Sequence, residues 1–273
     1  MRKTRHMPGL AAGLAGAALL ALAAPALAQK STADGIAEYR EMLQDGNPAE
    51  LFEMKGEELW QQKRGPRNAS LQQCDLGKGP GVVKGAFVEL PRYFADTGKV
   101  QDLESRLMYC METLQGIPSE TIIKGKFLKD ERAKVAALVA YVVTHSKGEK
   151  IAIDLSHPKV KEMYALGEKA FYYRTGAMDF ACSSCHSQDG KRIRATLLPN
   201  ITKPEGAAEG WGSWPAYRVS NSQFWTMQHR LWDCFRQQRT AEPIFASDVT
   251  IALSVFMAGK GNGAEAVWPG VKR

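Results

Sequence analysis

Cys182-Ser183-Ser184-Cys185-His186 is the stretch that decides the fold. Two cysteines three residues apart, followed at once by a histidine, suit covalent haem attachment, because the thiols can form thioethers to the porphyrin vinyls while the imidazole binds iron. A CxxC pair can also be half of a zinc site or a redox dithiol, but His186 follows directly and the chain has no second CxxC. We therefore predict one covalently bound haem c, anchored by Cys182 and Cys185 and ligated through His186.

The first 28 residues have the pattern of a secretory signal peptide. Arg2, Lys3 and Arg5 precede an Ala/Leu/Gly run over 10–24, and a small-residue cleavage motif ends at Ala28. No other stretch approaches the roughly 18 apolar residues of a transmembrane helix. We expect an exported periplasmic protein without a membrane span, in a compartment where disulfides persist.

The chain carries a net charge of +7, which is mildly basic and does not indicate nucleic-acid binding. Several basic residues follow the CxxCH stretch, namely Lys191, Arg192, Arg194 and Lys203. They could attract an anion, or they could simply belong to a solvated loop.

The second half of the chain repeats features of the first. Corresponding pairs are Gly56 and Gly167, Trp60 and Phe171, Gly65 and Gly176, Cys74 and Cys185, Pro91 and Pro215, Tyr93 and Tyr217, Arg106 and Arg230, and Cys110 and Cys234. Each half also ends in an apolar stripe of helical spacing, over 135–143 and 249–257. We predict a mostly α-helical protein of two tandem cytochrome c-like domains, 29–154 and 155–273, related by internal duplication.

The first domain is predicted to have lost its haem. Its counterparts of Cys182, Cys185 and His186 are Leu71, Cys74 and Asp75, which cannot anchor or ligate a haem in the usual way. Without a cofactor between them, Cys74 and Cys110 can approach and form a disulfide in an oxidising compartment. The alternative is a pair of unpaired buried thiols.

Cys234 is then an odd cysteine with an unusual setting. Arg230 lies four residues earlier and shares its helix face, and a guanidinium stabilises thiolate over thiol. The repeat also puts Cys234 where the distal ligand of the haem would come from. Met257 or Met227 could provide that ligand instead, as could His229.

The duplicated pattern, the single CxxCH and the later Arg230-Leu231-Trp232-Asp233-Cys234 segment resemble the SoxA family. These are the larger haem subunits of SoxAX complexes in bacterial thiosulfate oxidation, and the resemblance runs from about Tyr39 to Trp268. It implies the single-haem type, with His186 and Cys234 as axial ligands. It also implies a catalytic pair in which Cys234 is modified to a persulfide and Arg230 orients the anionic substrate.

The activity implied by the resemblance is that of an L-cysteine S-thiosulfotransferase. Such an enzyme joins thiosulfate oxidatively to a cysteine of the SoxYZ carrier protein. Electrons would pass through haem c to the small SoxX subunit and then to a soluble cytochrome c. From the residues alone, two other functions stay open: a simple periplasmic electron-transfer cytochrome with His/Met ligation, and a sensory haem protein that binds a gas.

Overall fold

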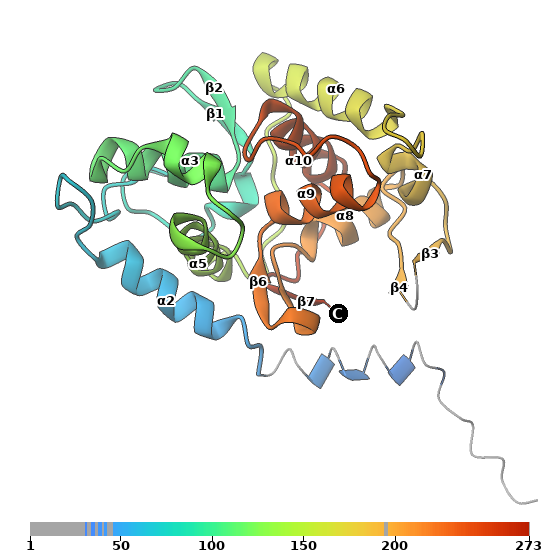
Figure 1. The fold of residues 1–273 in the computed structure, drawn as a ribbon, viewed down its shortest axis with the longest axis horizontal. Helices are drawn as coiled ribbons and strands as arrows, with labels where there is room; N and C mark the ends of the chain where they lie inside the picture. The colour runs from blue at the N-terminus through green and yellow to red at the C-terminus, as the bar shows by residue number, and fades with distance from the viewer. Residues whose placement is uncertain are drawn as a thin grey trace, which may run out of the picture.

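The computed structural model describes residues 46–193 and 196–272, together with residues 31, 34–35, 38–39 and 41–42. The predicted signal peptide and Arg194 lie outside the described residues. Over the described part, no helix combines the length and the apolar character needed to cross a membrane. In Figure 1 residues 50–144, coloured blue to green, lie to the left of residues 158–260, coloured yellow to red.

The described first half consists of helices and one short hairpin. Its helices are α2 (Glu50–Gln61), α3 (Leu103–Cys110), α4 (Ser119–Lys124) and α5 (Asp130–Thr144). A 3-10 turn (Phe87–Glu89) precedes the hairpin, and a π-helical segment (Met111–Gln115) continues α3. Strand β1 (Arg92–Phe94) pairs antiparallel with β2 (Lys99–Gln101).

The second half has the same kind of composition and two additional strands near the CxxCH stretch. Its helices are α6 (Pro158–Tyr172), α7 (Cys182–His186), α8 (Pro204–Gly212), α9 (Met227–Gln237) and α10 (Asp248–Lys260), with a 3-10 turn at Val219–Asn221. Strands β3 (Arg192–Ile193) and β4 (Thr196–Leu197) form a hairpin. Strand β5 (Ala216–Arg218) pairs antiparallel with β6 (Gln223–Trp225) and parallel with β7 (Gly270–Lys272).

A close helix pair organises each half, and a glycine makes the contact possible. A Cβ added to Gly56 of α2 would lie 2.1 Å from the carbonyl oxygen of Ala137 in α5. One added to Gly167 of α6 would lie 2.0 Å from the carbonyl oxygen of Ala252 in α10. The two predicted apolar stripes lie within α5 and α10, as expected, and most of their residues are fully buried.

The loops that leave α2 and α6 have matching conformations. An antiparallel bridge joins Arg64 to Ala69 in the first loop and Thr175 to Phe180 in the second. Gly65 and Gly176 have φ values of +68° and +75°, in the left-handed region that L side chains rarely adopt. The sequence correspondence between these two glycines is therefore matched by their geometry.

In the first half, a disulfide and apolar side chains occupy the region that corresponds in sequence to the CxxCH helix of the second half. Cys74 and Cys110 form a disulfide, as predicted, and Leu71 is completely buried. Arg106 is also buried, and its Nε donates a hydrogen bond of 2.6 Å to the carbonyl oxygen of Asp75. These contacts fill and close the region of the first half that corresponds to the CxxCH region of the second.

The two halves share one hydrophobic core. Phe87 of the first half packs against Trp268, with ring centroids 4.6 Å apart, and against Trp211 at 5.8 Å. Phe52 of α2 stacks on Phe224 of β6 at 5.8 Å. The buried side chains of both halves form a single cluster, so the position of one half depends on the other.

Substituting Gly167 by alanine is predicted to destabilise the protein by about 1–3 kcal/mol, because the new methyl group would force α6 away from α10. The gain in helix propensity of roughly 1 kcal/mol offsets only part of that cost. Urea unfolding of the purified protein measures the effect. Gly46→Ala is the control, because a Cβ added at Gly46 would have no atom within 4 Å; equal stability of the two variants would contradict the close contact.

Candidate active site

A cavity lies between α7 and α9, with about 1100 Å³ of space not filled by protein atoms, part of it open to solvent. Most of its wall is apolar, and the largest contributions come from α9 and residues 196–201, with others from α6, α8 and α10. The lining side chains with reactive or charged groups are Cys182, His186, Glu209, Arg218, Arg230, Cys234 and Lys272.

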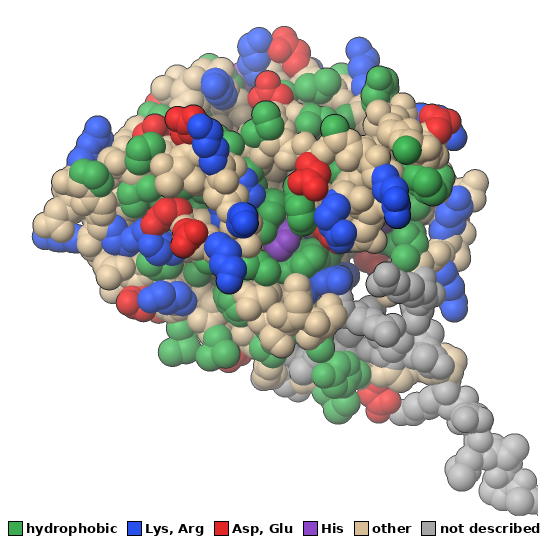
Figure 2. Space-filling model, viewed as in Figure 1, with side chains coloured by type: hydrophobic (Ala, Val, Ile, Leu, Met, Phe, Trp, Pro, Cys, Tyr) green, Lys and Arg blue, Asp and Glu red, His purple; other side chains and the backbone are tan. Residues whose placement is uncertain are grey.

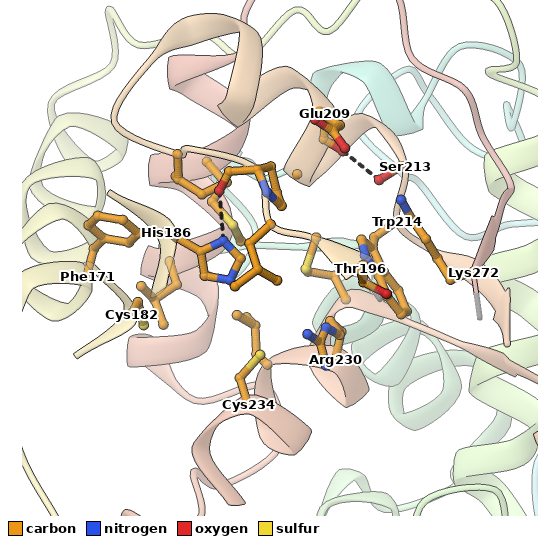
Figure 3. Close-up of a pocket in the computed structure, with 18 of the residues that line it drawn as sticks. Phe171, Cys182, His186, Thr196, Glu209, Ser213, Trp214, Arg230, Cys234 and Lys272 are labelled. Carbon is orange, nitrogen blue, oxygen red and sulfur yellow. Dashed lines mark hydrogen bonds between the residues drawn. The ribbon is translucent and has the colours of Figure 1, made fainter. Parts of the chain in front are cut away.

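His186 is held in the orientation and protonation state that suit a metal ligand. Its Nδ1 lies 2.9 Å from the carbonyl oxygen of Pro199, to which it can donate a hydrogen bond. Burial lowers the pKa of His186 and thus favours the neutral ring. Figure 3 shows the other ring nitrogen turned toward the middle of the cavity. A fixed Nδ1 with an available Nε2 is the arrangement that second-shell hydrogen bonds give to histidine ligands.

Cys182 and Cys185 are both unpaired and half-buried on α7. Burial, with a smaller contribution from the nearby Cys234, raises the pKa of Cys182 to about 12. A redox-active dithiol needs a lowered thiol pKa, so the environment of Cys182 does not favour that interpretation of the CxxC motif. Two unpaired thiols beside a neutral imidazole fit the requirements of covalent haem attachment.

Cys234 and Arg230 line the cavity from α9, as their spacing predicted. In Figure 3 both side chains point from this helix into the space below His186. The Arg230 guanidinium pairs with Asp233 at 3.1 Å and lies 5.6 Å from the centre of the Trp214 ring. The cavity thus has an imidazole on one wall and a thiol with a cation on the opposite wall.

Arg230 acts on Cys234 in the expected direction, because its charge favours the thiolate, but burial has the larger effect. Burial raises the pKa of the Cys234 thiol and outweighs the opposing effect of Arg230, while the charge of Asp233 raises it further. Arg230 also shares its charge with Asp233, which limits its effect on the sulfur. The thiolate therefore needs a stronger cation, and a coordinated metal ion deprotonates a thiol outright.

The alternative ligands divide into two groups. Met227 and Met257 both line the same cavity as Cys234. His229 lines a different, small cavity beside Phe127. Its ring is stacked between Phe127 and Trp225, with centroid distances of 4.2 and 3.9 Å, and burial lowers its pKa to about 3. The structure does not bring His229 to the cavity.

Arg218 also lines the cavity, although the sequence pattern did not indicate it as a site residue. Its Nε is buried and has no hydrogen-bond partner among the described residues. Arg218 lies beside Lys272 in the parallel pairing of β5 with β7, so two cationic side chains neighbour each other at the cavity wall. Burial and then the charge of Arg230 lower the pKa of Arg218. An anionic group of a bound cofactor, such as a porphyrin carboxylate, would satisfy this guanidinium.

The described basic residues after the CxxCH helix, Lys191, Arg192 and Lys203, do not form a simple anion-attracting cluster. Lys191 donates a hydrogen bond of 2.7 Å to the carbonyl oxygen of Ser184, and Lys203 pairs with Asp189 at 2.5 Å. Arg192 is exposed on β3. Figure 2 shows that Lys and Arg are interspersed with Asp and Glu over the face of the molecule in view. Lys203 and Arg192 thus behave as residues of a solvated loop. Lys191 instead stabilises α7 through its hydrogen bond to Ser184.

Comparisons with known proteins show which family the whole chain resembles. A family model described as SoxA/TsdA, cytochrome c domain, matches residues 55–151. An L-cysteine S-thiosulfotransferase subunit SoxA of Hydrogenophilus thermoluteolus is 61% identical over 265 residues, which cover 94% of this chain and 97% of that protein. A SoxA subunit of Hydrogenobacter thermophilus is 34% identical over the full length of both chains.

A solved structure has the same fold. The crystal structure of SoxXA from P. pantotrophus superimposes with a TM-score of 0.71 at 24% identity and covers 86% of this chain and 84% of that chain. The fold is thus mostly helical and cytochrome c-like. Because a relative more than half identical matches almost end to end, the chain belongs to the SoxA family of L-cysteine S-thiosulfotransferase subunits.

Proposed function

We propose that this chain is the haem-bearing subunit of an L-cysteine S-thiosulfotransferase that joins thiosulfate to a cysteine of a SoxYZ-like carrier protein. In that reaction the terminal sulfur of thiosulfate forms a bond to the cysteine sulfur, and the carrier S–H bond breaks. One proton and two electrons are released. Haem c, held by Cys182, Cys185 and His186, would supply the acceptor for these electrons, which would then pass to a SoxX-like partner subunit and a soluble cytochrome c.

One covalently bound haem c fits the cavity of the second half. Cys182 and Cys185 would carry the thioethers, and His186 and Cys234 would hold the iron. Support comes from the fixed Nδ1 of His186, the unpaired thiols and the buried Arg218 nitrogen without a partner among the described residues. When bound, the haem supplies a one-electron acceptor next to sulfur.

The observation that carries the proposal is the joint presence of Arg230 and Cys234 on the cavity wall opposite His186. The Arg230 guanidinium, whose side chain is 24% exposed, can attract and orient the thiosulfate dianion. The polarisable sulfur of Cys234, as a thiolate or as a persulfide, then faces both the substrate and the electron acceptor. A simple electron carrier has no need of this pair.

We further propose that 29–154 and 155–273 are duplicated domains, of which the first has lost its haem. The matching loops at Gly65 and Gly176 and the two glycine-mediated helix pairs support this origin. In the first domain, the buried Cys74–Cys110 disulfide would occupy part of the volume of the lost cofactor.

The proposed setting is the periplasm, with a SoxX-like small cytochrome as the partner in a heterodimer. The signal-peptide pattern supports export, and the related crystal structure is of a SoxXA assembly.

Replacing Cys234 by alanine is predicted to leave one haem covalently attached but to abolish thiosulfate-dependent turnover with the carrier. Intact-mass analysis measures haem attachment. In the protein without the substitution, it also reports any additional sulfur on Cys234. The ferric absorption spectrum should change, because the thiolate ligand is lost. If Cys234→Ala keeps normal turnover, the assigned role of Cys234 is refuted. If Met227→Ala or Met257→Ala changes the spectrum and Cys234→Ala does not, a methionine is the ligand.

Replacing Arg230 by alanine is predicted to lower kcat/KM for thiosulfate about 10- to 100-fold, as expected for the loss of a hydrogen bond to a charged group. The loss should persist at every ionic strength, because the contact is direct. Arg192→Gln is the matched control: it removes an exposed charge and should slow substrate capture only at low ionic strength. A loss for Arg230→Ala that vanished in salt would contradict the assigned contact.

A further inference from the structure

Two buried carboxyl groups of the first half hold the start of the helix that carries Arg230 and Cys234. Asp102 and Glu104, at the N-terminus of α3, are 2% and 3% exposed. Gln228, in the first turn of α9, donates through Nε2 to Asp102 at 2.5 Å and through its backbone N–H to Glu104 at 3.3 Å. Its side-chain oxygen accepts from the N–H of Ala246. Gln228 is 1% exposed and is thus fixed on three sides.

The contact joins equivalent positions of the two halves. Glu104 and Gln228 are 124 residues apart, the same spacing that separates Cys110 from Cys234. Each is the second residue of its helix, after the N-caps Asp102 and Thr226. Two helix N-termini, each with a partial positive charge, therefore meet in the core. Carboxyl groups between them offset the repulsion of the two helix dipoles.

The hydrogen bonds of Asp102 and Glu104 indicate which of the two carboxyl groups carries a proton. Asp102 accepts three of them, from the N–H and hydroxyl of Ser105 and from Gln228, so it is the better place for a negative charge. Burial and then the charge of Asp102 raise the pKa of Glu104 to about 8. Among its described neighbours, Asp102 is the charged group that acts on Glu104, since α9 presents the neutral Thr226 and Gln228.

The link to the cavity is α9 itself. Gln228, Arg230 and Cys234 lie on one uninterrupted helix of 11 residues. A shift of its first turn therefore moves the guanidinium and the thiol together. Asp233, which accepts from Arg230, Arg236 and Gln237, stiffens the following turn, so the first turn depends on the contact with the other half.

We propose that Glu104, in its protonated form beside ionised Asp102, is a positioning residue of the first half that holds α9 and thereby sets Cys234 and Arg230 against the cofactor cavity. This inference rests on the proposed function for its catalytic consequence. Through α9, the first half would thus influence the chemistry of the second half. Ionisation of Glu104 would put two like charges into a buried site and act against the contact.

The first experiment measures the anchoring of α9 by hydrogen exchange of the peptide 227–237 in the full-length haem protein. Glu104→Ala should exchange about tenfold faster than the unmodified protein, since about one hydrogen bond is lost. Glu104→Gln keeps an acceptor and should restore slow exchange. Glu112→Gln, an exposed carboxyl of the same half, is the matched control and should have no effect. Unchanged exchange in both Glu104→Ala and Glu104→Gln would overturn the anchoring role.

The second experiment follows the ferric haem spectrum on both sides of pH 8. The unmodified protein should show a transition with a midpoint near the Glu104 pKa of about 8, toward weaker Cys234 ligation at higher pH. Glu104→Gln should keep the low-pH spectrum throughout. A transition that persists in Glu104→Gln would overturn the inference. If Cys234→Ala leaves the spectrum unchanged, the ligand role in the proposed function fails, and the exchange experiment still decides the anchoring of α9.

The pH dependence of unfolding gives an independent check on the buried proton. Because the folded pKa of Glu104 lies above the ordinary glutamate value of 4.5, folding requires a bound proton between these two pH values. The urea midpoint should therefore fall as pH rises from about 4.5 to about 8 and then level off. The fall should be smaller in Glu104→Gln; an equal fall in both proteins would contradict a proton on Glu104.

Discussion

The closely packed helix pair in each half is the constraint on which the rest of the structure depends. Gly167 lets α6 touch the backbone of α10, and Gly56 does the same for α2 and α5. This contact fixes where the following loop leaves the first helix, and that loop delivers α7 with its two cysteines and histidine. The position of the imidazole thus depends on the backbone packing of α6 against α10.

The same framework is completed in two different ways. In the first half, a disulfide and buried apolar and arginine side chains close the interior. In the second half, the equivalent region stays open as a cavity lined by an imidazole, thiols and cations. A buried guanidinium nitrogen without a described partner is costly, and its presence at Arg218 indicates that this interior is built around an anionic group. The same helix arrangement therefore forms a closed first half and a second half with reactive side chains, and one hydrophobic core joins them.

The electrostatics of the cavity depend on burial more than on any single ion pair. Burial favours neutral His186 and a protonated Cys234, against the effect of Arg230. Burial thus acts on both groups in favour of their neutral forms. At the junction of the two halves, the carboxyl groups of Asp102 and Glu104 lie between two facing helix N-termini and accept hydrogen bonds from Gln228.

The sequence by itself determined the haem-binding motif, the Cys74–Cys110 pairing, the two terminal helices and the shared face of Arg230 and Cys234. These features depend on residue type and on spacing within one helix or one repeat, which a sequence shows directly. It did not reveal Arg218, because β5 and β7 are brought together only by folding, nor did it show that His229 lies between two aromatic rings. The protonation of Cys234 was also decided by tertiary structure, since desolvation depends on everything that surrounds the sulfur. Likewise, only folding brings Glu104 to Gln228, because contacts between helix ends distant in the chain follow from the packing of the two halves and not from any local pattern.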